Sequence, residues 1–233
     1  MPPGQSAAQQ ATAAKALQAM VAALFAAYGP QHWWPAETRF EMIVGAYLTQ
    51  ATAWRSVERS LENLRTAGLL HIDGIRKTPA ATLRELIRPS GFVQRKAASI
   101  LAFVDFLDEQ YDGSLDRLCR QVASVARPQL LSLPGVGPET ADAILLYALD
   151  HPAIVVDEYL RRVTVRHGLL TATASDHALR ALATTMLERR MQDTEVADAK
   201  EFHALIVEVG KRHCGSVAKC AGCPLEMFLP QRL

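Results

Sequence analysis

The chain has 233 residues, of which 49% are hydrophobic, so it can bury the core of one large domain or two small ones. Its 25 Lys and Arg residues nearly balance 24 Asp and Glu residues, which leaves a formal net charge of +1 at pH 7. This balance excludes a histone-like or tail-driven nucleic-acid binder. It does not exclude binding to nucleic acid through local geometry.

The N-terminal part predicts a loose tail, residues 1–9, and then a helix. An apolar run from Ala16 to Ala27 follows Lys15, which is also a pattern of signal peptides. We favour an amphipathic helix docked on a core, because apolar residues repeat there every 3.6 positions. These residues are Leu17, Met20, Val21, Leu24, Phe25 and Tyr28. No run is expected to be long enough to span a membrane, so we predict a cytoplasmic protein without a membrane partner.

Further helical patterns follow, separated by short breakers. Four helices are expected at about 39–49, at 54–67, from Thr78-Pro79 to about 89, and at 94–108. Two more are expected on either side of a turn, one that ends near Leu131 and one that begins at Pro138. The last three begin after Asp157, begin at Ser175-Asp176, and contain Phe202, Leu205, Ile206 and Val209 on one face. No alternating pattern predicts a strand, and the apolar run 153–156 is interpreted as a buried connector. The predicted fold class is all-α.

A tight turn, Leu133-Pro134-Gly135-Val136-Gly137, separates two of these helices. Gly135 and Gly137 permit backbone torsions that other residues resist, and they leave room for a close approach. The free amides of the turn and of the next helix can point at one anion, for which a DNA phosphate is the natural candidate. A plain connector with a glycine stop is the alternative for this stretch alone.

Four cysteines occur in the sequence. Cys119 stands alone and is interpreted as a small buried hydrophobe. Cys214, Cys220 and Cys223 crowd together near the end of the chain. Without a convincing export signal, this cluster favours a metal or cluster site over a disulfide.

Asp157 follows the buried connector at the start of a helix, where it can act as an N-cap. The hairpin, the next helix, the connector and this Asp together resemble the helix–hairpin–helix DNA glycosylases of the endonuclease III superfamily. Three more stretches resemble the family in the same order: AYLTQATAWRSV, SGFVQRKAASI and EFHALIVEVGKRHCGSVAKCAGCPL. The similarity covers about residues 30–224. It implies a six-helix domain at 31–150, a second domain formed by 1–30 and 151–233, and an active-site cleft between them.

The resemblance also implies roles for individual residues. Asp157 matches the catalytic carboxylate, which stabilises positive charge on the sugar and orients or deprotonates water. Gln50 would fill the gap left by a flipped nucleotide, and Phe92 would be a second wedge. The hairpin would bind DNA through Leu133, Gly135, Val136 and Gly137. We therefore expect double-stranded DNA with a damaged base as the partner of a monomeric enzyme.

Glu139 stands where bifunctional family members carry a lysine that forms a Schiff base with the sugar. A carboxylate cannot form an imine, so we predict a monofunctional enzyme. By itself, Glu139 is a favourable acid in the first turn of a helix. Two alternatives remain: a bifunctional oxidised-pyrimidine glycosylase with its lysine displaced to Lys96 or Lys211, and a non-catalytic module that keeps the hairpin.

The three tryptophans of the chain bear on the substrate. Trp33-Trp34-Pro35, with Trp54 four residues after Gln50, resembles the 3-methyladenine glycosylase branch of the superfamily. Electron-rich rings favour a cationic methylated purine by a cation–π interaction of about 0.5–2 kcal/mol. We expect Trp33 or Trp34 to sandwich the base with Trp54, while Pro35 holds one ring in position. The alternative interpretation is that these tryptophan rings are hydrophobic anchors between the domains.

The cysteine loop of the family has four cysteines, whereas Leu229 stands here six residues after Cys223. The resemblance implies a [4Fe–4S] cluster, which normally takes four thiolates. With Cys214, Cys220 and Cys223 alone, the cluster would be site-differentiated, labile or absent. Zinc bound by these cysteines and His203 or His213 is the competing interpretation.

Overall fold

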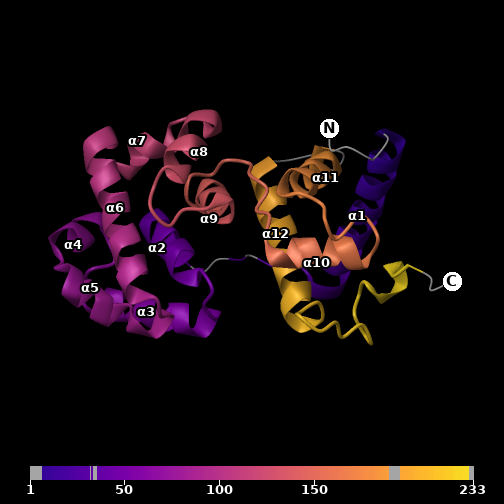
Figure 1. Cartoon of the computed structure of the whole chain (residues 1–233), viewed down its shortest axis with the longest axis horizontal. Helices are drawn as coiled ribbons and strands as arrows, with labels where there is room; N and C mark the ends of the chain where they lie inside the picture. Colours follow the sequence, from indigo (N-terminus) through magenta and orange to yellow (C-terminus); the bar gives the residue numbers. More distant parts are fainter. Residues whose placement is uncertain (1–6, 32, 34–35, 189–194, 231–233) are drawn as a thin grey trace. The chain divides into compact units, whose positions relative to one another are not determined.

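The computed structural model describes residues 7–31, 33, 36–188 and 195–230 and consists of helices and loops (Figure 1). Over these residues the only strand-like pairing is one isolated bridge between Cys214 and Ala218. The all-α prediction is confirmed. The chain divides into two compact units. Trp34–His151 form the first, called the hairpin unit; Met1–Trp33 and Pro152–Leu233 form the second, called the terminal unit.

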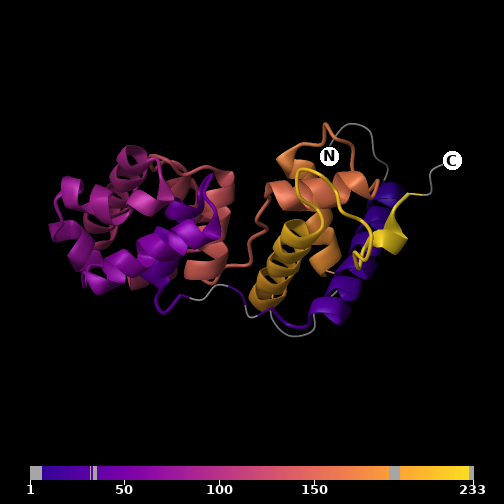
Figure 2. The ribbon, with the colours of Figure 1, turned by 90° about the horizontal axis from the view of Figure 1, so that it is seen from below.

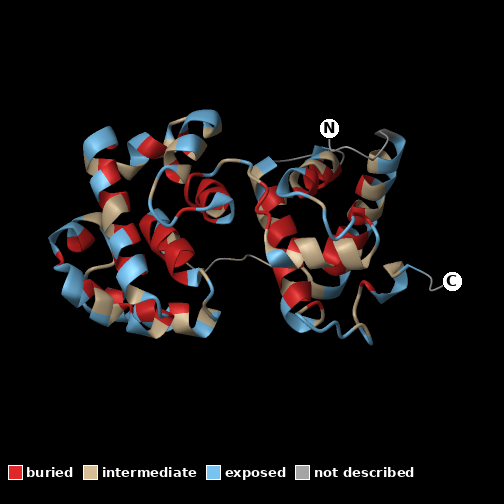
Figure 3. Ribbon diagram, in the orientation of Figure 1, coloured by how far each residue is buried: buried red, intermediate tan, exposed pale blue. Residues whose placement is uncertain are grey.

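The hairpin unit is built around a central helix, α2, whose residues are buried along most of its length (Figure 3). Thr38 caps this helix by accepting a hydrogen bond from the Glu41 amide at 3.1 Å. The unit contains α2 (Arg39–Thr49), α3 (Trp54–Thr66), α4 (Ile72–Lys77), α5 (Ala80–Leu86), η1 (Arg88–Ser90), α6 (Val93–Tyr111), α7 (Leu115–Cys119), α8 (Ala123–Leu131), α9 (Pro138–Ala143) and the π-turn η2 (Ile144–Ala148). Because α2 packs against α3, α6, α9 and η2, the hairpin is joined directly to the core.

Two details differ from the sequence predictions. Thr78 and Pro79 were expected at the N-cap and first position of a helix, but Thr78 is the C-cap of α4 and Pro79 the N-cap of α5. The reason is local: Thr78 Oγ1 donates to the Gly74 carbonyl at 2.6 Å instead of capping the next helix. Cys119 is half-buried rather than buried, with its Sγ 3.9 Å from the Ala148 carbonyl oxygen.

In its described residues, the terminal unit contains four α-helices and the cysteine loop (Figure 2). Its elements are α1 (Ala7–Tyr28), α10 (Glu158–Arg166), α11 (Asp176–Glu188), α12 (Glu195–Arg212) and η3 (Glu226–Phe228). Helices α10 and α12 approach closely at Gly210, where an added Cβ would lie 2.1 Å from Tyr159 Cδ1. Ile154, Val155 and Val156 are buried before α10, as predicted for the connector.

Helix α1 places Leu17, Met20, Val21 and Leu24 in the core, whereas Phe25 is 39% exposed. Its buried face packs against α11 and α12, as expected for a docked amphipathic helix. One expectation needs correction, because Ala8–Tyr28 is long and apolar enough to meet the length and composition criteria for a membrane span. A core helix meets the same criteria.

Candidate active site and DNA-contacting turns

The hairpin joins α8 to α9, and Gly135 makes its turn. The φ of Gly135 is +78°, a left-handed conformation that strains residues with a side chain. A Cβ on Gly135 would also lie 2.4 Å from Ser99 Oγ of α6. The Val136 amide donates to the Leu133 carbonyl at 3.2 Å, and Val136 is buried. Glycine is thus required at position 135 for two reasons, and the loop is fixed by its own backbone.

At position 137, neither a positive φ nor a steric clash requires glycine. Gly137 is the N-cap of α9 in an extended conformation, with φ −93° and ψ 177°. A Cβ on Gly137 would meet nothing within 4 Å. The space beside it is therefore open, so a phosphate oxygen can approach the backbone at the start of α9.

We expect Gly137→Val to weaken binding to lesion-containing and lesion-free duplexes alike, by about tenfold, because phosphate contacts carry no sequence information. The protein should stay folded, since the new side chain enters open space, at a cost of about 1 kcal/mol for a β-branched N-cap. Fluorescence anisotropy with both duplexes at one salt concentration measures this. A loss confined to the damaged duplex would instead assign Gly137 to the base pocket.

Gln50 ends α2 and lies against the hairpin. Its Nε2 donates to the Gly135 carbonyl at 2.9 Å and to Thr140 Oγ1 at 3.0 Å. Its Oε1 accepts from Arg95 Nη2 at 3.3 Å. The structure therefore brings two of the predicted DNA-contacting elements together. Entry of Gln50 into the DNA stack would exchange these bonds for contacts with the estranged base.

Phe92 is a large side chain held on the surface. Phe92 is 67% exposed and follows Gly91 in the connection between η1 and α6. Its backbone angles are φ +47° and ψ 34°. The left-handed conformation costs a non-glycine residue about 1–2 kcal/mol. An exposed aromatic ring on strained backbone has no role in the core of this unit, and its conformation is consistent with the predicted wedge.

Lys96 links the turn of Gln50 to the turn of Phe92. It is 2% exposed, and its ammonium donates to the Leu48 carbonyl at 2.8 Å, to Thr52 Oγ1 at 2.6 Å and to the Ser90 carbonyl at 2.8 Å. Burial lowers the pKa of Lys96 to about 8, with a smaller contribution from Arg95, so the amine is still mainly protonated at neutral pH. All three of its hydrogens are then used inside the protein.

Asp157 caps α10 in the terminal unit. Its Oδ1 accepts from the Leu160 amide at 2.7 Å. The preceding connector is held by the side chain of Arg180, whose Nη1 donates to the Ile154 carbonyl at 2.6 Å. The Asp157 side chain is only 9% exposed. It is therefore a largely desolvated carboxylate at a helix N-terminus, where the helix dipole favours negative charge.

A chain of successive contacts leads from Asp157 through His203 and Trp33 to Lys211. His203 Nε2 on α12 lies 3.6 Å from Asp157 Oδ2. The ring of Trp33 packs edge-on against the His203 ring, with 5.4 Å between the centroids. Lys211 Nζ lies 5.4 Å from the centroid of the Trp33 ring. In this Asp157 cluster the carboxylate and the electron-rich ring suit stabilisation of positive charge, whereas the Lys211 cation opposes it.

Comparison with known proteins decides the family. Residues 44–189 match the HhH-GPD superfamily of base excision DNA repair proteins. The chain belongs to this superfamily. A protein of Methanocaldococcus jannaschii named as a DNA repair glycosylase is 42% identical over 203 residues, which are 86% of this chain and 90% of that protein. The HhH-GPD chain is thus a DNA glycosylase of base excision repair.

Two solved structures are similar to this HhH-GPD glycosylase. The H. pylori 3-methyladenine DNA glycosylase bound to 1,N6-ethenoadenine has a TM-score of 0.74 and 27% identity, covering 86% of this chain and 97% of that one. An endonuclease III trapped as a covalent intermediate with DNA has a TM-score of 0.75 and 21% identity, covering 94% and 96%. The second similarity shows the fold alone.

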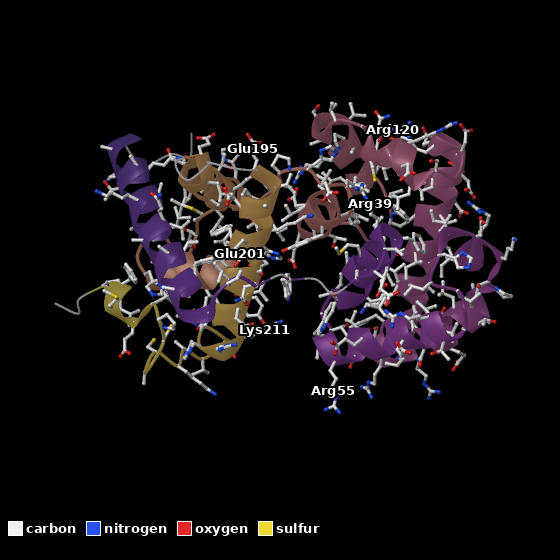
Figure 4. All side chains as sticks on the ribbon, turned by 180° about the vertical axis from the view of Figure 1, so that it is seen from behind. Arg39, Arg55, Arg120, Glu195, Glu201 and Lys211 are labelled. Atoms are coloured by element: carbon white, nitrogen blue, oxygen red, sulfur yellow. The ribbon has the colours of Figure 1, made fainter. Side chains whose placement is uncertain are left out.

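Glu139, predicted from the family resemblance to stand at the lysine position of bifunctional members, is exposed in the first turn of α9. Of the two displaced candidates, Lys96 is enclosed by its three acceptors and does not resemble an accessible nucleophile. Lys211 is exposed on α12, where Figure 4 labels it. Lys211 is therefore the candidate that a test of strand cleavage must address.

The remaining tryptophans of the predicted base pocket are placed only in part. Trp34 and Pro35 lie outside the described residues. Trp54 begins α3 in the hairpin unit, and its Nε1 donates to Glu58 Oε1 at 2.7 Å. It lines a surface groove with charged side chains, among them Arg55, which extends away from the ribbon in Figure 4. Its stacking role stays a prediction.

The cysteine loop of the glycosylase encloses a cavity of about 400 Å³. Cys214, Cys220 and Cys223 line it together with His213 and Leu229. Burial raises the pKa of the Cys223 thiol, and the neighbouring Cys214 and Cys220 raise it further. The three thiols therefore line one and the same cavity.

The donors of this loop do not fit a four-thiolate cluster. Leu229, where the resemblance predicts a fourth cysteine, lines the cavity with an apolar side chain, and Arg166 Nη1 lies 3.1 Å from Cys214 Sγ. In the described part of the chain, no three His, Cys, Asp or Glu side chains are arranged to hold a metal ion. The zinc alternative with His203 loses its fourth ligand, because that ring faces Asp157 and does not line the cavity.

Sequence reasoning missed two contacts of this site. His203 was considered only as a metal ligand, although it lies beside Asp157. Lys96 was considered only as a nucleophile, although it joins two turns. The available signal for His203 was a single polar residue within an otherwise apolar helical face, whereas Lys96 shares its buried face with Ser99.

Proposed function

We propose that this glycosylase is monofunctional and hydrolyses the N-glycosidic bond of alkylated purines, such as 3-methyladenine, in duplex DNA. Glu139 supports monofunctional activity, because it lies in the helix after the hairpin, where a bifunctional enzyme would need an amine. The packing of Trp33 against His203, which lies beside Asp157, supports an alkylated purine as the substrate. Similarity to the H. pylori 3-methyladenine glycosylase supports the same substrate class. We expect a cytoplasmic monomer.

In the proposed reaction, the damaged nucleotide is flipped out and positive charge develops on its sugar as the base leaves. Asp157 stabilises that charge and orients or deprotonates the attacking water. The hydrogen bond from the Leu160 amide to Oδ1 holds the carboxylate in place at the start of α10. A base with a fixed positive charge leaves as a neutral molecule, so little acid catalysis is required.

The test is a panel of duplexes that carry one lesion each, scored for base release and strand breaks. The proposal expects release of 3-methyladenine, with strand breaks only after alkali treatment. Borohydride should leave no covalent protein–DNA adduct, because an imine forms only with an amine. Strand cleavage without alkali, together with a trapped adduct, would establish a lyase instead.

A bifunctional enzyme is the second candidate, and Lys211 is the observation that favours it. Its exposed ammonium lies over Trp33, next to the Asp157 cluster. The fold is also that of an endonuclease III trapped covalently on DNA. If wild-type protein forms a borohydride adduct, loss of the adduct in Lys211→Met, with Lys200→Met as an α12 control, would identify the nucleophile.

Trp33→Leu is expected to lower the preference for 3-methyladenine over neutral purines by about two- to thirtyfold, the equivalent of a cation–π interaction of about 0.5–2 kcal/mol. Leucine keeps apolar bulk but has no π face. Single-turnover excision of 3-methyladenine and 1,N6-ethenoadenine, with circular dichroism as a fold control, measures the change. Parallel losses on both bases would show that Trp33 only supports the fold; Trp54→Leu applies the same test to the second predicted ring.

A further inference from the structure

His203 contacts two residues of the proposed site at once. Its Nε2 lies 3.6 Å from Asp157 Oδ2, and its ring packs edge-on against Trp33. The His203 and Asp157 side chains are 8% and 9% exposed, so solvent screens their interaction little. Phe202 and Leu205, on the same helix, are buried in the core of the unit. His203 therefore projects from a firmly held part of α12.

Each oxygen of the Asp157 carboxylate has a polar neighbour, one at hydrogen-bond distance and the other slightly beyond it. Oδ1 accepts from the Leu160 amide, and Oδ2 faces the His203 imidazole. A carboxylate held at one oxygen can still turn about its Cβ–Cγ bond, and a polar group close to the second oxygen restricts that rotation. Orientation matters here because a charged group stabilises a transition state best when it is already in place.

The segment that carries Trp33 is attached to the same helix at a second point. The Gln31 amide donates to the two Glu201 carboxylate oxygens at 3.0 and 3.2 Å. Glu201 and His203 are both residues of α12, and Figure 4 labels Glu201 on that helix. Helix α12 thus determines where both the Asp157 carboxylate and the Trp33 ring lie.

We propose that His203 is a positioning residue, whose imidazole orients the Asp157 carboxylate and holds the Trp33 ring beside it. This rests on the catalytic role proposed for Asp157. A neutral ring with its hydrogen on Nε2 directs a donor at the carboxylate and leaves its charge intact. An imidazolium would offset the charge that stabilises the sugar. A side chain with a neutral donor at the same place should therefore preserve the rate.

Three substitutions test the position of the donor. His203→Gln places an amide nitrogen near the site of Nε2, His203→Asn places it near the site of Nδ1, and His203→Leu removes it. Base release from a 3-methyladenine duplex, with enzyme in excess, reports the chemical step. We expect about 10- to 100-fold lower rate constants for Leu and Asn, and a loss within about threefold for Gln. Equal losses in the Gln and Leu variants would overturn the proposal.

Thermal unfolding of each variant excludes a loss of fold, with His177→Leu on the exposed face of α11 as the matched control. If the Leu variant does not fold, the comparison rests on Gln and Asn, which carry the same amide at different places. The proposal is supported if His203→Gln keeps the rate of base release and His203→Asn loses it. Equal rates in the two folded amide variants contradict it.

A double variant separates this proposal from the proposed function. In an Asp157→Asn background, His203→Leu should have no further effect on the rate constant of base release, because the carboxylate that it orients is gone. A further tenfold loss would show that His203 acts elsewhere. If Asp157→Asn alone retains wild-type turnover, the catalytic assignment is wrong, and the positioning role falls with it.

Discussion

Asp157→Asn is expected to lower the rate of base release by about 100-fold or more while binding to damaged duplex DNA is retained. The reason is the loss of the counter-charge for the sugar, since an amide of the same shape carries no net charge. Asparagine is also a good N-cap, so the bond from the Leu160 amide to Oδ1 can persist. Single-turnover kinetics and anisotropy on the same duplex measure the two effects separately.

Asp157→Ala provides the structural control for this experiment. It removes the cap of α10 as well as the charge, and should cost about 1 kcal/mol of stability that Asp157→Asn keeps. If Asp157 were only a cap, the alanine variant would be unstable and the asparagine variant fully active. Near wild-type turnover in Asp157→Asn would therefore remove Asp157 from the chemistry.

The parts of the fold that follow from local rules could be predicted from the sequence. An Asp after an apolar run indicates an N-cap, and Asp157 is the N-cap of α10. A glycine-rich stretch between two helical patterns indicates a tight turn, and Gly135 adopts a left-handed conformation there. The short helices α4 and α7, with six and five residues, were not predicted because they are too short to show a helical period.

The arrangement of the site depends on contacts between residues far apart in the chain, which local rules do not supply. His203 meets Asp157 and Trp33 only because α12 packs beside α10 and the segment before position 33 is attached to it. The conformation of Phe92 is equally hidden, because an exposed phenylalanine is not a residue that favours positive φ. Such positions, where local preference is overruled, are where functional constraints concentrate.

Lys96→Met is expected to lower the free energy of unfolding by about 3 kcal/mol, because three buried acceptors lose their donor while the apolar stem is kept. Urea denaturation at neutral pH measures the loss. Lys15→Met, at an exposed position of α1, is the control and should stay within about 0.5 kcal/mol of wild type. A similar small change for Lys96→Met would show that the observed bonds contribute little.

The difference in the free energy of unfolding between wild type and Lys96→Met should increase with pH. The pKa of Lys96 is about 8 in the folded chain, against an ordinary value of 10.5. Between these values the unfolded chain binds more protons than the folded chain, so the Lys96 contribution to stability rises with pH across that interval. The stability gap between wild type and Lys96→Met should therefore widen from about pH 8 to about pH 10.5. A gap that narrows over this range would mean that the three acceptors hold the ammonium more firmly than burial penalises it.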